Sequence, residues 1–157
     1  MGVCCSSASG GSSACGWSRV AVQGGILRLE TPGRGAIVDL TEGVRRVVRT
    51  AGVQRGLVGV FATGSTVAVT TLEYEPGAVA DLRALLDRLI PAAGDYEHNR
   101  RNHDSNAHAH LRAALIGPSE TVPLVDGELA LGTWQQIVLL DFDERPRRRT
   151  VTVQVIF

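Results

Sequence analysis

The stretch GLVGVFATGSTVAVTTLEYEP, residues 56–76, contains two runs rich in β-branched residues, separated by Thr63-Gly64-Ser65. Runs of this kind, bounded by small polar residues, are typical of β-strands joined by a loop. Pro76 suits the first turn of a helix, because its missing N–H group would have no partner there. The stretch therefore predicts two strands, a short loop between them and a helix that begins at the proline.

About three helices are predicted in all. Residues 41–51 place apolar side chains at helical spacing, with Thr41 as the N-cap and Gly52 at the end. The second helix carries an apolar stripe of period 3.6 and stops before Pro91. That stripe consists of Val79, Leu82, Leu86 and Leu89. Good helix formers indicate a third helix over about residues 105–116.

Alternation of polar and apolar residues predicts further strands on both sides. Residues 18–30 alternate around Gly24-Gly25, which suits two short strands or one bulged hairpin. A turn is predicted at Asp126-Gly127. The remaining strand-like segments are residues 120–125, 129–143 and 149–157. Because helices and strands do not alternate regularly, the predicted class is α+β, a single compact domain with a mixed, largely antiparallel sheet.

The first residues differ from the rest in composition. Residues 1–16 are rich in Ser, Gly and Cys, so we expect a flexible tail before a folded domain of residues 17–157. Cys4, Cys5 and Cys15 all lie in this tail, which argues against a disulfide framework. The opening residues also fit an acylation signal, and the cysteines fit a soft-metal site. A leader without a role is the third interpretation.

Charge and hydropathy exclude two classes of partner. Sixteen basic and sixteen acidic residues give a formal net charge of zero, which removes the broad attraction to phosphate backbones that nucleic-acid binding uses. No apolar run reaches the roughly 20 residues of a membrane span, and no basic flank with an apolar core marks a secretory signal. We therefore expect a soluble cytoplasmic protein that binds neither nucleic acid nor membranes.

Charged residues near two strand ends have alternative interpretations. The arginines at residues 145–149 could form a local anion patch, but Pro146 and the alternating residues after it favour a solvated strand entry. Asp141 and Asp143 are predicted to be solvated strand ends. For the pair Glu73 and Glu75, the alternatives are acid–base chemistry and an exposed edge.

All four histidines lie in YEHNRRNHDSNAHAHL, residues 96–111. Imidazole titrates near neutrality and is the commonest nitrogen ligand of metals, so this cluster suggests a function. We expect His103, which lies among arginines and asparagines, to be solvated. We predict that at least two of His98, His108 and His110 share a site. The alternative is a structural role, in which one histidine is half buried for packing.

A helix that begins at Asp104 or Ser105 would place two of these histidines in its first turns. Free backbone N–H groups and the positive end of the helix dipole point outward there, and both favour an anion. His108 and His110 lie on nearly opposite sides of a helix, yet both could reach a group beyond its end. The segment therefore predicts a site for a negatively charged metabolite.

Three short motifs then point to a family. They are Tyr-x-His at residues 96–98, Asn-x-His-x-His-Leu at residues 106–111 and Leu-Gly-Thr-Trp-Gln-Gln at residues 131–136. With GRGAIVDLTEGVRRVV upstream, they resemble the YjbQ-like secondary thiamine-phosphate synthase family from about residue 17 onward. Many members carry a histidine where this chain has Ala62-Thr63-Gly64-Ser65-Thr66, so that ligand is absent here.

The resemblance implies a compact α+β subunit that assembles as a homotrimer, with the histidine site near a subunit boundary. It also implies a weak thiamine-phosphate synthase activity, which joins hydroxymethylpyrimidine diphosphate to thiazole phosphate and releases pyrophosphate. The catalytic residues that carry over are His98, Asn106, His108 and His110, with Thr133 and Gln135 as substrate-binding neighbours.

For the synthase reaction, the residues suggest how charge on the leaving pyrophosphate is stabilised. The hydroxyl groups of Ser65 and Thr66 would donate hydrogen bonds to phosphate, together with the histidines. A Mg²⁺ ion could be held through Asp104 or Glu73. The catalyst mainly needs donors and cations, because few protons move.

Two other functions are compatible with the same residues. A metal-dependent hydrolase of a phosphorylated metabolite would bind Zn²⁺ through His98, His108 and His110 and activate water at an open position. A trimer that binds a small metabolite without catalysis is the other, with Trp134 in the core or at an interface.

Overall fold

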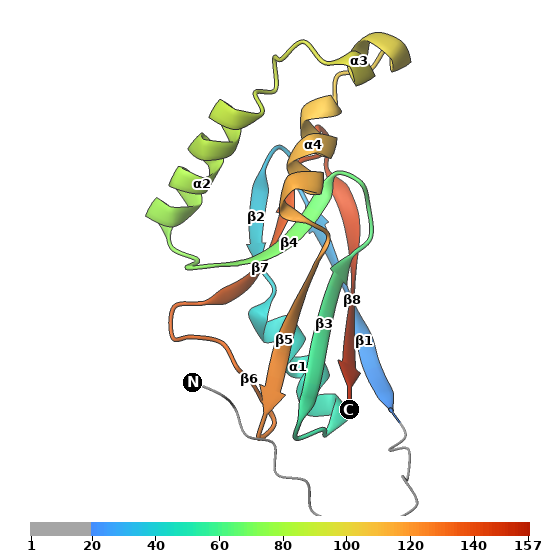
Figure 1. Cartoon of the computed structure of the whole chain (residues 1–157), viewed down its shortest axis with the longest axis vertical. Helices are drawn as coiled ribbons and strands as arrows, with labels where there is room; N and C mark the ends of the chain where they lie inside the picture. Colours follow the sequence, from blue (N-terminus) through green and yellow to red (C-terminus); the bar gives the residue numbers. More distant parts are fainter. Residues whose placement is uncertain (1–19) are drawn as a thin grey trace, which may run out of the picture.

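The computed structural model describes residues 20–157 of the chain. The expectations for Cys4, Cys5, Cys15 and the start of the domain therefore lie outside the described residues. The elements, in chain order, are β1 (Val22–Thr31), β2 (Ala36–Asp39), α1 (Thr41–Ala51), β3 (Gly56–Ala62), β4 (Val67–Leu72), α2 (Pro76–Leu89), α3 (Glu97–Asn102), α4 (Ala107–Ile116), β5 (Ser119–Val125), β6 (Glu128–Leu129), β7 (Gln136–Asp141) and β8 (Arg147–Ile156) (Figure 1).

The strands form two sheets, and every paired strand runs antiparallel to its neighbour. Five strands lie in the order β1-β8-β3-β5-β6, and three lie in the order β2-β7-β4. The prediction of a compact α+β domain with largely antiparallel pairing is confirmed. One short helix, α3, joins the three that the sequence predicts.

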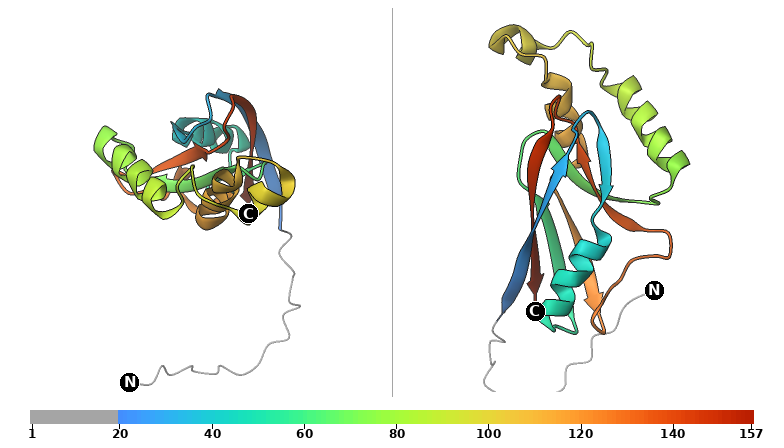
Figure 2. Two further views of the ribbon diagram at one scale, coloured as in Figure 1. Left: turned by 90° about the horizontal axis from the view of Figure 1, so that it is seen from above. Right: turned by 180° about the vertical axis from the view of Figure 1, so that it is seen from behind.

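The main core lies between the two sheets and α1. Ile137 and Leu139 of β7 pack there against valines of β3, β4, β8 and α1. Val138 and Leu140 face the other way, into a second cluster that α4 and part of α2 cover (Figures 1 and 2). Burial on both faces explains why residues 137–140 are an unbroken apolar run without exposed surface.

The outer face of the five-stranded sheet is open to solvent. Along β3, the buried residues Val58 and Val60 alternate with the exposed residues Leu57 and Phe61. Side chains alternate between the two faces of a strand, so the exposed set forms one surface. Ile156 of β8 extends that surface. An apolar face of this kind typically contacts another molecule.

The prediction of two short strands or one bulged hairpin around Gly24-Gly25 is wrong, because β1 is one continuous strand that pairs with β8 along its length. The two glycines allow close approach rather than a turn. A Cβ atom on Gly24 would lie 2.2 Å from the carbonyl oxygen of Val153, and one on Gly25 would lie 3.1 Å from Val47 of α1. The glycine pair therefore reflects packing against distant residues and not a turn.

The three predicted helices are present, with differences at their ends and faces. Thr41 is the first residue of α1 rather than its cap: its N–H group donates to Asp39 at 2.8 Å, and its hydroxyl accepts from the N–H of Ile137 at 3.0 Å. In α2, Leu86 is buried in the core, whereas Leu89 of the predicted stripe is exposed. No helix in residues 20–157 is long and apolar enough to cross a membrane.

Candidate functional site

The N-terminal end of α4 meets α3 and the loop between β3 and β4. His98 of α3 uses both ring nitrogens: Nε2 lies 3.2 Å from Oδ1 of Asn106, and Nδ1 lies 3.1 Å from Nδ2 of Asn102. His110 of α4 places Nδ1 3.1 Å from the carbonyl oxygen of Ser65. The rings of His98 and His110 meet edge to face, with centroids 5.0 Å apart. The structure thus brings His98, Asn106, His110 and Ser65 together.

These contacts decide which ring nitrogens can bind a ligand. A carbonyl oxygen only accepts hydrogen bonds, so Nδ1 of His110 donates to Ser65 and Nε2 is left for a ligand. In His98, Nε2 donates to the amide oxygen of Asn106, and Nδ1 accepts from the amide nitrogen of Asn102. His98 therefore orients its neighbours, while Nε2 of His110 is left for a ligand.

His108 faces a different part of the molecule. Its side chain is buried, with 8% of the residue exposed, and its Nδ1 donates to the carbonyl oxygen of Ser105 at 3.2 Å. The ring lines a cavity of about 590 Å³, together with residues of α2, α4 and the turns before β2 and β8. Residues two positions apart on a helix are rotated by roughly 200°. His108 is therefore separated from the pair formed by His98 and His110.

A protein side chain caps the N-terminal end of α4. The helix begins at Ala107, with Asn106 at the N-cap position, slightly later than the predicted start. Oδ1 of Asn99, in α3, accepts a hydrogen bond from the N–H group of Ala107 at 3.0 Å. The space beyond the helix end, where the sequence predicts an anion, thus contains α3. The predicted position of the anion is therefore occupied by protein.

Thr133, Gln135 and Glu73 lie at the far end of β4 from the histidines. The single strand predicted over residues 129–143 is wrong, because a loop separates β6 from β7. Gln135 holds this loop by accepting from the N–H of Gly132 at 3.1 Å and donating to Thr71 at 3.0 Å. The six residues of β4 rise about 3.3 Å each, or about 20 Å in total. Within one subunit, these predicted substrate-binding residues are remote from His110.

Trp134 projects from the same loop and is 71% exposed. A core position is therefore excluded, and an interface or stacking position is left. A shallow hollow of about 390 Å³ lies beside it, lined by Thr71, Leu72, Glu73 and the loop itself. His103, the histidine expected to be solvated, is exposed at the C-terminal end of α3.

The residues predicted to bind a metal ion do not converge within one subunit. His108 and His110 face different surroundings, Glu73 lies beyond the far end of β4, and Asp104 accepts a hydrogen bond from the N–H of Ser105 at 2.7 Å. Among residues 20–157, no three His, Cys, Asp or Glu side chains are placed to share one cation. A trihistidine zinc site does not fit this arrangement, since both nitrogens of His98 already have partners.

A buried ion-pair network lies next to the histidines, and the sequence reasoning missed it. Asp141 has no exposed surface, and Arg149 donates to its two carboxylate oxygens from Nε at 2.7 Å and from Nη2 at 2.5 Å. Thr31 donates to the same carboxylate. The hydroxyl of Thr66 accepts from Arg149 at 2.9 Å and donates to Asp143 at 3.0 Å. The network therefore ties the two sheets together at the histidine end.

The prediction that Asp141 and Asp143 are solvated strand ends is wrong, and so is a solvated position for Arg149. A signal for this was available in the alternation of β7. Ile137 and Leu139 face the main core, so the next residue on that face, Asp141, must also be buried. A buried carboxylate requires a cation, and the arginine run supplies it. Other members of that run stay exposed.

The network also fixes the loop that positions His110. Gly64 has a φ of +145°, and a Cβ atom there would lie 3.0 Å from Nη1 of Arg149. Glycine is therefore needed for the loop to pass this closely. Thr66, predicted to bind phosphate, is buried and has its hydroxyl engaged by Arg149 and Asp143. By holding Thr66, the network holds the preceding carbonyl of Ser65, which receives the His110 hydrogen bond.

Local donors lower the pKa of two carboxyl groups. Burial raises the pKa of Asp143, but hydrogen bonds from Arg147, from the backbone of Arg145 and from Thr66 outweigh it and hold the pKa below its ordinary value. The pKa of Glu75 is lowered because its carboxylate accepts from the first N–H groups of α2. Glu75 is thus a helix N-cap, and β4 ends before Glu73, so the pair does not share a strand face.

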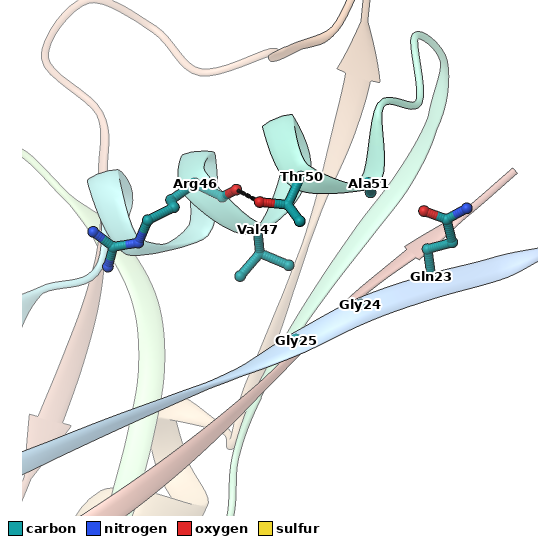
Figure 3. Close-up of a pocket in the computed structure, with 7 residues that line it drawn as sticks. All are labelled: Gln23, Gly24, Gly25, Arg46, Val47, Thr50 and Ala51. Carbon is teal, nitrogen blue, oxygen red and sulfur yellow. Dashed lines mark hydrogen bonds between the residues drawn. The ribbon is translucent and has the colours of Figure 1, made fainter.

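A separate groove lies between α1 and β1 (Figure 3). It measures about 320 Å³, and a Cβ atom on Gly25 would point into it toward Val47 of α1. Arg46 is the ionisable residue of its lining, and the hydroxyl of Thr50 donates to the carbonyl oxygen of Arg46 at 2.9 Å. None of the predicted site residues lines this groove.

Comparison with known protein sequences finds one family. The family described as UPF0047 protein YjbQ-like matches residues 25–157. A UPF0047 protein of Archaeoglobus fulgidus is 42% identical over 130 residues, which covers 83% of this chain and 98% of that protein. A UPF0047 protein of Methanothermobacter thermautotrophicus is 38% identical over 129 residues, which covers 82% of this chain and 88% of that protein.

Solved structures lead to the same family. A YbjQ-like protein of unknown function from Sulfolobus solfataricus has a TM-score of 0.83 at 30% identity, and the match covers 88% of this chain and 99% of that one. An uncharacterized conserved protein of the YjbQ/UPF0047 family from Clostridium acetobutylicum has a TM-score of 0.76 at 34% identity, over 83% of this chain and 98% of that one. The chain described here therefore belongs to the YjbQ-like UPF0047 family.

Proposed function

We propose that this chain is a transferase of the thiamine-phosphate synthase type, which acts on phosphorylated metabolites near the N-terminal end of α4. The observation that carries the proposal is the meeting of His98, Asn106, His110 and Ser65, which come from three segments of the chain. The motifs at residues 96–111 and 131–136 supply the reaction, since they resemble those of secondary thiamine-phosphate synthases.

In this reaction, the thiazole nitrogen attacks the methylene carbon of hydroxymethylpyrimidine diphosphate. The bond between that carbon and the phosphate oxygen breaks, and pyrophosphate leaves with the electron pair. Hydrogen-bond donors and cations near the leaving oxygens therefore lower the barrier more than a strong base would. His110 can fill this role in its imidazolium form, in which Nδ1–H donates to Ser65 and Nε2–H is left to donate to a leaving oxygen.

A metabolite-binding protein without catalysis is the second candidate. It is favoured by the separation of Thr133 and Gln135 from the histidines, since one subunit does not gather all the predicted substrate-binding residues. A zinc hydrolase has less support, because its three histidine ligands do not converge. Binding of a thiazole phosphate that raises the melting temperature, without any turnover, would favour the second candidate.

We also propose that the chain assembles as a homotrimer through the open face of the five-stranded sheet. The central positions of that face, which are exposed or half-buried, carry no charge, which is typical of the core of a protein interface. They are Leu57, Gly59, Phe61, Thr121, Pro123, Thr152, Gln154 and Ile156. Light scattering on the purified protein tests this: Phe61→Glu should give monomers, and a monomeric wild-type protein at micromolar concentration would contradict the proposal.

The synthase proposal is tested by measuring pyrophosphate release from the two purified substrates, with and without Mg²⁺. His110→Asn keeps a donor for the Ser65 carbonyl and removes Nε2, so we expect turnover to fall by roughly tenfold to a thousandfold. His103→Asn is the matched control, because that ring is exposed and lies outside the cluster. Equal turnover in His110→Asn and the wild type, with matching melting temperatures, would refute the assignment.

A further inference from the structure

We propose that the cavity beside His108 is a binding site for the phosphate group of a small metabolite. Three guanidinium groups line it: Arg34 in the turn between β1 and β2, Arg112 in α4, and Arg145 in the turn between β7 and β8. Its volume of about 590 Å³ lies within the range of roughly 300–1,000 Å³ that small-molecule sites occupy. The identity of the metabolite rests on the proposed function, whereas phosphate binding does not, because it can be measured without any turnover.

Two of the three guanidinium groups have donors to offer a ligand. Arg112 donates to Asp87 at 2.8 Å and to a backbone carbonyl at 3.0 and 2.6 Å, so it is engaged within the protein. Arg34 donates Nε to the carbonyl oxygen of Glu144 at 3.3 Å and forms no ion pair among residues 20–157. Within the same residues, Arg145 likewise has no ion-pair partner. Arg34 and Arg145 can therefore both bind an anion.

The two carboxylates of the lining leave a net charge of +1 against its three guanidinium groups. Asp87 is paired with Arg112, and one oxygen of Glu144 accepts a hydrogen bond from the hydroxyl of Ser105 at 2.7 Å. The lining is therefore still cationic, and the forks of N–H donors of Arg34 and Arg145 match the oxygens of a phosphate group.

His108 and Phe142 define the rest of the ligand. Because Nδ1 of His108 is bonded to Ser105, Nε2 is the nitrogen that the cavity can use, on a ring that is more than nine-tenths buried. Phe142 and Ala92 supply apolar wall. These groups fit a phosphate ester whose remainder is small and partly apolar, such as a phosphorylated heterocycle.

The backbone holds Arg34 in a conformation that needs support. Its φ of +56° is in the left-handed region, which costs energy for a residue with a side chain. The N–H of Arg34 donates to the carbonyl oxygen of Asp143 at 2.6 Å, and that of Gly35 donates to Asp141 at 2.8 Å. The turn is thus fixed to the segment that carries the buried ion pair. Strained residues kept in place in this way tend to mark functional positions.

Isothermal titration with inorganic phosphate and with pyrophosphate tests the site. Arg145→Met keeps the backbone N–H that Asp143 uses, and Arg34→Asn tolerates a positive φ. His108→Asn keeps a donor for the Ser105 carbonyl. We expect each variant to weaken binding roughly tenfold or more. The arginine variants remove charge-assisted donors, and His108→Asn removes Nε2, which can accept from a P–OH group while Nδ1–H is bonded to Ser105. Arg46→Met, in the groove of Figure 3, is the matched control and should bind like the wild type.

The outcomes separate this site from the proposed reaction. Phosphate binding that is lost in the three cavity variants, in a protein without synthase turnover, supports the site and refutes the reaction. Turnover in a protein whose pyrophosphate affinity does not change in those variants refutes the site. No binding of either anion at millimolar concentration, or equal weakening by Arg46→Met, also refutes the site. Melting temperatures of all variants check that each has folded.

Discussion

Replacing Arg149 by methionine should destabilise the domain more than any surface change. The substitution keeps an unbranched side chain but removes the two donors that reach Asp141 at 2.7 and 2.5 Å. Asp141 has no exposed surface, so water cannot replace them, and among residues 20–157 only Thr31 and one backbone N–H still donate to it. Breaking a buried ion pair in this way costs about 3–5 kcal/mol.

That loss is a large part of the roughly 5–15 kcal/mol that stabilises a typical domain. Each kcal/mol changes the melting temperature of a domain of this size by roughly 2–4 °C, so the temperature should fall by roughly 6–20 °C. Urea titration and thermal melting at neutral pH measure the change. The matched control is Arg148→Met, because Arg148 is the next residue in β8 and pairs with Glu30 in solvent. Its effect should stay within about 1 kcal/mol.

A double variant separates the ion pair from simple packing. Arg149→Met combined with Asp141→Leu removes both charges, so we expect it to recover much of the stability that the single change loses. If the single variant loses less than about 1 kcal/mol, or if the double variant is no more stable than the single one, the buried charge does not have the cost assigned to it.

Three further predictions concern single residues. The pKa of Asp143 is lowered in the folded state, so its carboxylate stabilises the fold fully above the pKa of the unfolded carboxyl, about 4. This stabilisation is lost as the pH falls through the lower pKa of the folded state. The difference in unfolding free energy between the wild type and Asp143→Asn should therefore shrink in acid denaturation below about pH 4. Gly64→Ala should destabilise the domain by about 1–3 kcal/mol in urea titration, because φ is positive and Arg149 lies 3.0 Å from the added carbon; an unchanged midpoint would show that the loop can move aside. Trp134→Ala should leave the melting temperature of the monomeric Phe61→Glu background unchanged, because the ring is 71% exposed, and a clear fall there would mean that the ring packs within its own subunit.

Local patterns were sufficient to predict most elements of this fold. The two valine-rich runs became β3 and β4, and the apolar spacing of residues 41–51 became α1. In these segments, the spacing of the apolar side chains and the turn residues at the segment ends predict the same element. The hairpin at Gly24-Gly25 failed because a glycine pair marks a turn or a close backbone approach equally well. Contacts with β8 and Val47, which lie far away in the sequence, determine that the segment is a strand.

The candidate site was harder to predict than the fold. The motifs singled out the right histidines to examine, but spacing alone did not show that His108 would turn away from His110. Their direction depends on Ser65 and Ser105, whose carbonyls accept the two ring protons. Arg34 carries no local signal in the sequence, because its turn is fixed only by the carbonyl oxygens of Asp141 and Asp143. Such contacts between distant segments are not visible in any short pattern.

The position of β8 has a consequence for how the chain folds during synthesis. It lies between β1 and β3 in the larger sheet, yet it is made after every other strand. Until then β1 has no strand to pair with, and one edge of β3 stays free on the ribosome. Open strand edges bind other chains, so newly made protein should be most prone to aggregate just before β8 emerges. A deletion within β8 would for the same reason detach β1 from the sheet, rather than shorten an edge.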